Sequence, residues 1–165
     1  MKVSEPIETR SLGRIDIAIL DALQTDATVS VSALAKRVGL STTACWNRVQ
    51  RLEVDGVITR RVALVDPVKV GAGLCVFVSI RTSEHSREWL EVFAEKVSAM
   101  PEVVEFYRMG GDVDYMLRVL VSNMDAFDGF YKRLVDGITL ADVTSRFAME
   151  RIKHTTAVPL PEPTR

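Results

Sequence analysis

Residues Val31–Leu52 have the sequence VSALAKRVGLSTTACWNRVQRL, which has the organisation of a helix-turn-helix. Its first helix begins after Ser30, a residue type that caps helix N-termini. Gly39 then allows a tight turn, and Ser41 caps a second helix, expected over 42–54. Together with an earlier helix the stretch forms a small bundle. The side chains expected in its core are Leu12, Ile15, Ile19, Leu20, Leu23, Leu34, Ala35, Val38 and Leu40.

One face of the helix over 42–54 is polar. At about 100° per residue, Cys45, Val49 and Leu52 gather on the opposite, core-facing side. The polar side carries Thr, Asn, Gln and Arg, the residue types that contact base edges and phosphates in a major groove. The candidate DNA-binding residues, which include a basic pair after the helix, are Thr42, Thr43, Trp46, Asn47, Gln50, Arg51, Arg60 and Arg61. Two alternatives stay open: Trp46 packs on its own domain, or the whole face simply contacts water.

The charge distribution supports an anion-binding surface in this part of the chain. The 165 residues carry a net charge of −1, yet the stretch from Thr28 to Arg61 holds six basic and two acidic residues, a net charge of +4. A compact basic segment on an otherwise acidic chain favours a local anionic partner, of which nucleic acid is the obvious one.

The rest of the chain alternates between strand and helix patterns. An extended segment over 57–65 follows the helices, so the N-terminal part is expected to be a winged helix-turn-helix, and Gly71–Gly73 gives a flexible joint. Beyond it, strands are expected over 74–81, 103–108, 113–121 and 142–152, with helices over 86–98 and 125–135. This βαββαβ order is the ferredoxin-like pattern of an α+β domain. Its two helices can cover one sheet face, so a partner subunit is expected on the other.

Several function classes lack support in the sequence. Cys45 and Cys75 are too far apart for a redox or zinc motif, and His85 and His154 are expected on the surface, so no metal site or other cofactor is predicted. Neither a phosphate-binding loop nor a nucleophile elbow occurs. The apolar runs are far shorter than the roughly 20 residues of a membrane helix. We expect a soluble, cytoplasmic protein that is not an enzyme.

These motifs resemble the Lrp/AsnC (feast/famine) transcriptional regulators. The resemblance begins with Asp16-x-x-Ile19-Leu20-x-x-Leu23, continues through the helix-turn-helix to Gly56-Val57-Ile58, and includes Gly111-Asp112-x-Asp114-Tyr115 and Met149-Glu150-x-Ile152-Lys153. It covers about residues 12–160. It implies that the second domain is the effector-binding and oligomerisation (RAM) domain, which assembles homodimers and, in the family, tetramers or octamers.

The resemblance also implies a binding site for an amino acid between subunits. A free amino acid needs an acceptor for its ammonium group, and the turn at Gly110 with its two aspartates offers close backbone approach and carboxylates. The site residues implied are Gly110, Gly111, Asp112, Asp114, Met124, Thr144, Arg146 and Ala148. Without the resemblance, such a turn is ordinarily just a hairpin.

Three details bear on specificity. Thr42–Ala44 stand where many members have a proline, and Gly110 adds a glycine to the effector loop. The stretches Cys45-Trp46-x-Arg48 and Phe147–Thr156 resemble a branch associated with sulfur-containing and small neutral amino acids.

We therefore predict a DNA-binding domain over 10–61, a linker strand and joint over 62–73, an effector and assembly domain over 74–158 and a tail over 159–165. The predicted function is a sequence-specific transcriptional regulator whose assembly or DNA affinity responds to a small amino acid. Its expected partners are an imperfect palindromic operator and further copies of itself, with no membrane. An architectural DNA-binding protein without an effector, or a ferredoxin-like small-molecule enzyme, are the alternatives.

Overall fold

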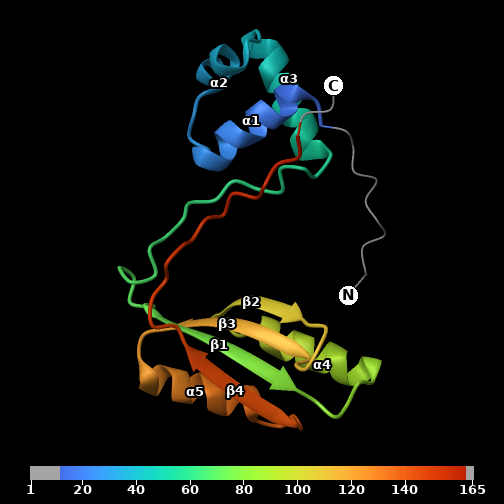
Figure 1. Cartoon of the computed structure of the whole chain (residues 1–165), viewed down its shortest axis with the longest axis vertical. Coiled ribbons are helices and arrows are strands. Elements are labelled where there is room, and N and C mark those ends of the chain that lie inside the picture. Colours follow the sequence, from blue (N-terminus) through green and yellow to red (C-terminus); the bar gives the residue numbers. More distant parts are fainter. Residues whose placement is uncertain (1–11, 163–165) are drawn as a thin grey trace. The chain divides into compact units, whose positions relative to one another are not determined.

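A computed structural model describes residues 12–162 of the chain (Figure 1). Contacts divide the described residues into two compact units, one comprising 12–63 with 153–162 and the other 64–152. The first unit contains helices α1 (Arg14–Thr25), α2 (Val31–Val38) and α3 (Thr42–Val54). None of the helices in residues 12–162 is both long and apolar enough to cross a bilayer.

The helix-turn-helix forms where its capping residues predict. Ser30 Oγ accepts a hydrogen bond from the Ala33 amide, and Ser41 Oγ accepts one from the Ala44 amide, each at 3.2 Å. Gly39 ends α2 at φ +72°, in the left-handed region that favours glycine. These caps satisfy amides that a helix start leaves unpaired, so both helix starts are confirmed.

Apolar side chains from all three helices form the core of the first unit. The fully or nearly fully buried ones are Ile19, Leu20, Ala22, Leu34, Ala35, Cys45, Val49 and Leu52. The other expected core residues, such as Leu12 and Leu40, are half-buried and pack against this cluster. The predicted inward face of α3 is therefore confirmed.

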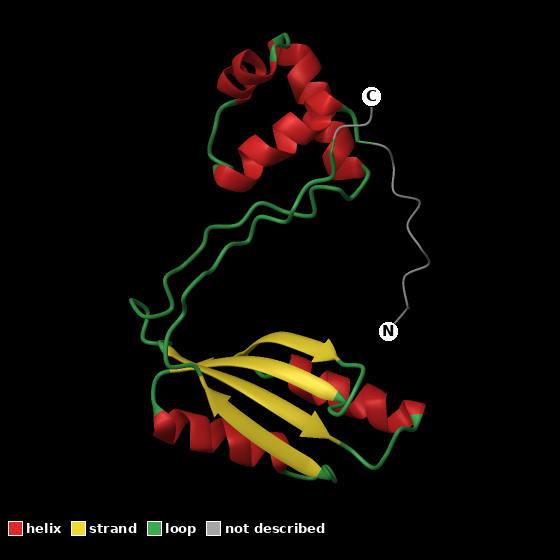
Figure 2. Cartoon of the chain, viewed as in Figure 1, coloured by secondary structure: helices red, strands yellow, loops and turns green. Residues whose placement is uncertain are grey.

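The second unit is a four-stranded antiparallel sheet with two helices (Figure 2). Its elements, in chain order, are β1 (Leu74–Arg81), α4 (Arg87–Ser98), β2 (Val103–Arg108), β3 (Tyr115–Val121), α5 (Met124–Val135) and β4 (Asp142–Phe147). The strand order is β2-β3-β1-β4. This confirms the ferredoxin-like βαββαβ architecture.

Both helices lie on the same face of this sheet (Figures 1 and 2). Val76, Val78 and Ile80 of β1 are fully buried against Phe93 of α4 and Phe130 of α5. The alternate residues of the strands form the opposite, open face. Its side chains include the exposed Phe77 and Tyr107 and the half-buried Cys75, Met116 and Leu120.

The expected wing strand, the linker strand and two strand limits are wrong. Residues 57–65 and 62–73 form no strand, because nothing in the described chain pairs with them in a sheet, so the first unit has three helices and no wing strand. β3 begins at Tyr115 rather than Val113, since the preceding residues form a turn. β4 ends at Phe147, opposite Val76 of β1, rather than at Ile152. Since β1 begins at Leu74, residues 150–152 have no β1 residue opposite them.

The open face generates a prediction about assembly. Replacing Phe77, which is 40% exposed at the centre of that face, by Lys should convert the expected homodimer into monomers, because the partner would then have to bury an unpaired charge. Analytical ultracentrifugation at micromolar concentration measures this. Val92→Lys is the control, since Val92 is 61% exposed on α4. If the dimer dissociation constant of Phe77→Lys equals that of the wild type, the open face is not the subunit interface.

Candidate nucleic-acid interface and effector site

The exposed face of α3 carries the groove-contacting residues that the sequence predicts. Thr42, Thr43 and Asn47 are exposed, and Trp46 is 51% exposed. Trp46 therefore lies on the surface of its domain. The first two turns of α3 thus present hydroxyl, amide and indole groups, with no carboxylate among them.

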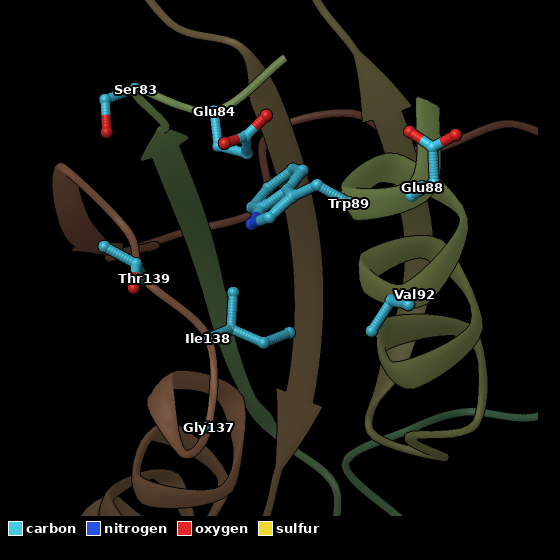
Figure 3. A pocket seen from close by; sticks show the side chains of 8 residues that line it. All are labelled: Ser83, Glu84, Glu88, Trp89, Val92, Gly137, Ile138 and Thr139. Carbon is cyan, nitrogen blue, oxygen red and sulfur yellow. The ribbon is translucent and has the colours of Figure 1, made fainter. Parts of the chain in front are cut away.

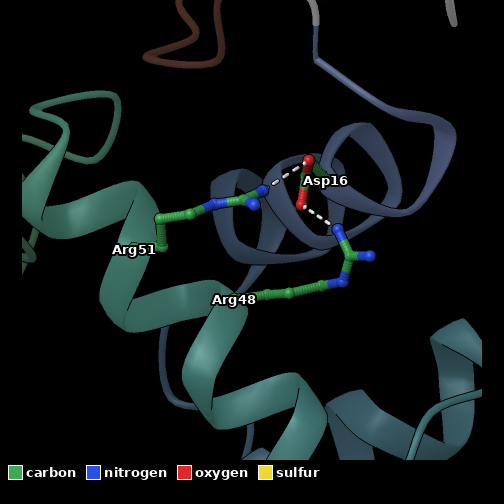
Figure 4. Close-up of polar contacts among 3 residues, drawn as sticks. All are labelled: Asp16, Arg48 and Arg51. Carbon is green, nitrogen blue, oxygen red and sulfur yellow. Dashed lines mark hydrogen bonds and ion pairs between the residues drawn. The ribbon is translucent and has the colours of Figure 1, made fainter.

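A buried carboxylate on α1 joins that helix to α3 (Figure 4). Asp16 is 4% exposed, and its two oxygens accept hydrogen bonds from two different arginines. Arg48 Nη1 lies 2.9 Å from Oδ1, and Arg51 Nη2 lies 3.0 Å from Oδ2. Charge-assisted hydrogen bonds of this kind are among the strongest side-chain contacts. Asp16 therefore fixes α3 against α1 at two successive turns.

This contact gives Arg51 a second role beside the predicted phosphate contact. Its Nη2 donates to Asp16, while the side chain stays 52% exposed. Asp16 is not among the candidate residues that the sequence predicts. A signal was present: Asp16 lies at the helical spacing of the core residues Leu12, Ile19 and Leu23, and a charged residue on an apolar stripe needs a partner.

A second carboxylate gathers two more candidates at the C-terminal end of α3. Glu53 Oε1 pairs with Arg61 Nη2 at 2.7 Å, and Glu53 Oε2 accepts a hydrogen bond from Gln50 Nε2 at 2.8 Å. The structure thus brings Arg61 to α3 although the segment between them is not a strand. Arg60 is exposed, as are Lys36 and Arg37 at the end of α2.

The effector candidates in the turn between β2 and β3 lie together. Gly111 has φ +120°, and the Met109 amide donates to the Asp114 carbonyl at 2.8 Å, which closes the turn. Asp112 is exposed, whereas Asp114 Oδ2 accepts a hydrogen bond from the Thr82 amide at 2.8 Å. Asp114 therefore ties the turn to the segment that follows β1.

The candidates on β4 point along the open face of the sheet. Arg146 Nη1 donates to Ser79 Oγ on β1 at 2.6 Å, and Thr144 Oγ1 donates to Asp142 Oδ2 at 2.9 Å. Ala148 follows the strand, with its amide bonded to the Cys75 carbonyl at 3.0 Å.

Met124 is not brought to the turn within one chain. It begins α5, directly after the end of β3, whereas the turn precedes the start of β3. The intervening strand separates them by roughly 20 Å at about 3.3 Å per residue. A site that contains both Met124 and the turn therefore requires more than one subunit. The expected site between subunits has this property.

A surface pocket of about 500 Å³ lies between α4, the segment after β1 and the segment after α5 (Figure 3). Trp89 and Ile138 supply apolar walls, and Glu84 lies next to the indole of Trp89. Hydrogen bonds from the backbone and side chain of Ser86 lower the pKa of Glu84, which keeps its carboxylate charged. The Thr82 segment, which Asp114 holds, leads into this pocket.

The two cysteines are free thiols. Burial in the helical core raises the pKa of the Cys45 thiol, so it stays protonated and unreactive. Among residues 12–162, His, Cys, Asp and Glu side chains form no group of three or more that could hold a metal ion.

Comparisons with known proteins match both units of the chain. Residues 12–53 match the model of the AsnC-type helix-turn-helix domain, and residues 75–158 match that of the Lrp/AsnC ligand binding domain. The chain is 50% identical over 153 residues to the glutamate uptake regulatory protein of Zymomonas mobilis, covering 93% of each. It is 52% identical over 150 residues to the DNA-binding transcriptional activator DecR of Escherichia coli, covering 90% of this chain and 99% of that one.

Two solved structures share the fold. An AsnC family transcriptional regulator from Agrobacterium tumefaciens has a TM-score of 0.86 at 62% identity, covering 88% of this chain and 95% of that one. The transcriptional regulator NMB0573 of Neisseria meningitidis, in complex with L-Met, has a TM-score of 0.85 at 33% identity, covering 90% and 96%.

The buried carboxylate of the first unit gives a stability prediction. Asp16→Asn should raise amide exchange in α3 by lowering its opening free energy by about 1–3 kcal/mol, because both arginines lose a charge-assisted bond but can rehydrate. Hydrogen exchange of the full chain measures it. Asp21→Asn, an exposed position on the same helix, is the control and should change nothing. Equal exchange in the two variants would contradict the bridging role of Asp16.

Proposed function

Because the chain belongs to the Lrp/AsnC family of transcriptional regulators, we propose that it recognises an operator through α3 and responds to an amino acid through its sheet domain. It is a DNA-binding regulator and not an enzyme. The observation that carries the proposal is the exposed polar face of α3, held in place by Asp16, on a chain whose second unit is a ligand-binding domain. The cytoplasm is its proposed location.

The DNA contacts divide into two kinds. Thr42, Thr43, Asn47 and Gln50 are proposed to contact base edges, with Trp46 at the rim of the groove. Arg60 and Arg61 are proposed to contact phosphates, which set affinity rather than sequence preference. Gln50 and Arg61 must leave Glu53 to do so. Arg51 acts through Asp16, as a positioning residue.

Dimerisation sets the form of the operator. Two copies of α3 related by a two-fold axis require two half-sites of opposite orientation, about one helical turn or a multiple apart. An imperfect palindrome is therefore the proposed target. The DNA-binding domain is proposed to span 10–61 and the effector and assembly domain 74–158, with 62–73 as the linker and 159–165 as the tail.

The effector site is proposed at the turn of residues 110–114, completed by another subunit. The exposed Asp112 is suited to accept from the ammonium group, while backbone amides near Gly110 and Gly111 approach the carboxylate. Arg146 and Thr144 on β4, together with Ala148 and a Met124, are proposed to complete its walls. The L-Met bound to the Neisseria meningitidis regulator supports an amino acid as the ligand class.

The groove contacts can be tested against the phosphate contacts. Asn47→Ala should reduce the preference for a selected operator over a scrambled duplex by about 1–3 kcal/mol. Arg60→Ala should weaken binding to both duplexes alike and flatten the salt dependence. Fluorescence anisotropy titrations at several salt concentrations measure both effects. If Asn47→Ala leaves the preference intact, α3 does not contact base edges through this residue.

The effector site can be tested by calorimetric titration with L-methionine. Asp112→Ala should weaken binding by about 1.5–3 kcal/mol, more than tenfold in Kd, because the ammonium loses a charged acceptor. Asp114→Ala should weaken L-methionine binding as well. It should also increase amide hydrogen exchange over residues 82–86, because the substitution removes the hydrogen bond from the Thr82 amide. Asp128→Ala, exposed on α5, is the control. Unchanged affinity in Asp112→Ala would place the ammonium elsewhere, and no response to any amino acid would favour an architectural role.

A further inference from the structure

The segment after β4 returns to the helical unit and docks there. Residues 153–162 cluster with the three helices and not with the sheet. The Val158 amide donates to Gln24 Oε1 at 2.7 Å, and Gln24 Nε2 donates to the Val158 carbonyl at 3.3 Å. Leu160 is half-buried against the helical core. The segment is therefore held by a paired hydrogen bond and an apolar anchor.

The docking point lies on the helix that positions α3. Gln24 is in the last turn of α1, and Asp16 of the same helix binds Arg48 and Arg51 of α3. A helix moves as a rigid element, so a pull on Gln24 displaces Asp16 as well. Any change in the position of the docked segment therefore acts on the recognition helix through two charge-assisted hydrogen bonds.

The other end of the segment is continuous with the sheet. β4 carries Thr144 and Arg146, and the Ala148 amide makes a hydrogen bond to β1 beyond the end of the strand. The chain consequently passes between the two units twice, once after Ala63 and once after Ile152. The second of these connections continues directly into the docked segment.

We propose that residues 155–160 form a docked tether that transmits the effector state of β4 to α1, with Gln24 as its docking residue. This inference rests on the proposed effector response. The tether itself binds no ligand. It makes the free energy of the sheet domain depend on the position of α1, which is what coupling between two sites requires.

The test compares DNA affinity with and without L-methionine in the full chain. Gln24→Ala removes both hydrogen bonds, and Ala is a good helix former, so α1 should stay folded. The ratio of the two Kd values, typically between about 5 and 150 in coupled systems, should fall to about 1, while effector-free DNA binding is retained. Thr156→Ala, exposed in the same segment, is the matched control and should keep the wild-type ratio.

Hydrogen exchange provides a readout that needs no effector. The Val158 amide should be protected in the wild type and exchange freely in Gln24→Ala, and Leu160→Ser should have the same effect by removing the apolar anchor. Two results would overturn the tether. One is an unprotected Val158 amide in the wild type. The other is a ratio of the two DNA Kd values in Gln24→Ala that equals the wild-type ratio. If the wild-type protein binds DNA with the same Kd in the presence and absence of L-methionine, the other amino acids are tested in turn. A ratio of one with all of them would overturn the effector response and the transmission proposed here, while exchange would still decide whether the segment docks.

Discussion

The buried carboxylate of Asp16 is the contact on which the DNA-binding surface depends. A charge that is 4% exposed is stable only with partners, and both of its oxygens are satisfied by α3. Two bonds at Arg48 and Arg51, one helical turn apart, restrict both the rotation and the tilt of α3. The exposed side of that helix, with Asn47 and its neighbours, is thereby presented in one orientation.

The same contact separates two roles that look alike in the sequence. Arg51 and Arg60 are both basic and exposed, yet Arg51 also donates a hydrogen bond from Nη2 to Asp16. In the sheet domain Asp112 and Asp114 differ in the same way, because Asp114 holds Thr82. In each pair, one residue is held by a contact within its own unit.

Patterns over short stretches predicted much of the fold. Ser30, Gly39 and Ser41 set the helix-turn-helix correctly because capping and positive φ are properties of a few adjacent residues. The resemblance to Lrp/AsnC regulators is confirmed by the two family models. The limits of β3 and β4, and the absence of a strand over 57–65, could not be predicted, because strand length depends on the residues that a distant neighbour offers.

The sequence by itself determined the kind of protein this is: a helix-turn-helix followed by a βαββαβ domain, with polar side chains on one helix and two aspartates in one turn. Those properties follow from local propensity and from periodicity, which are written in neighbouring residues. Only the tertiary structure decided which polar groups are occupied. Asp16 meets arginines more than 30 residues away, and Gln24 meets Val158 across 134 residues, because such pairs form only when packing brings remote segments together.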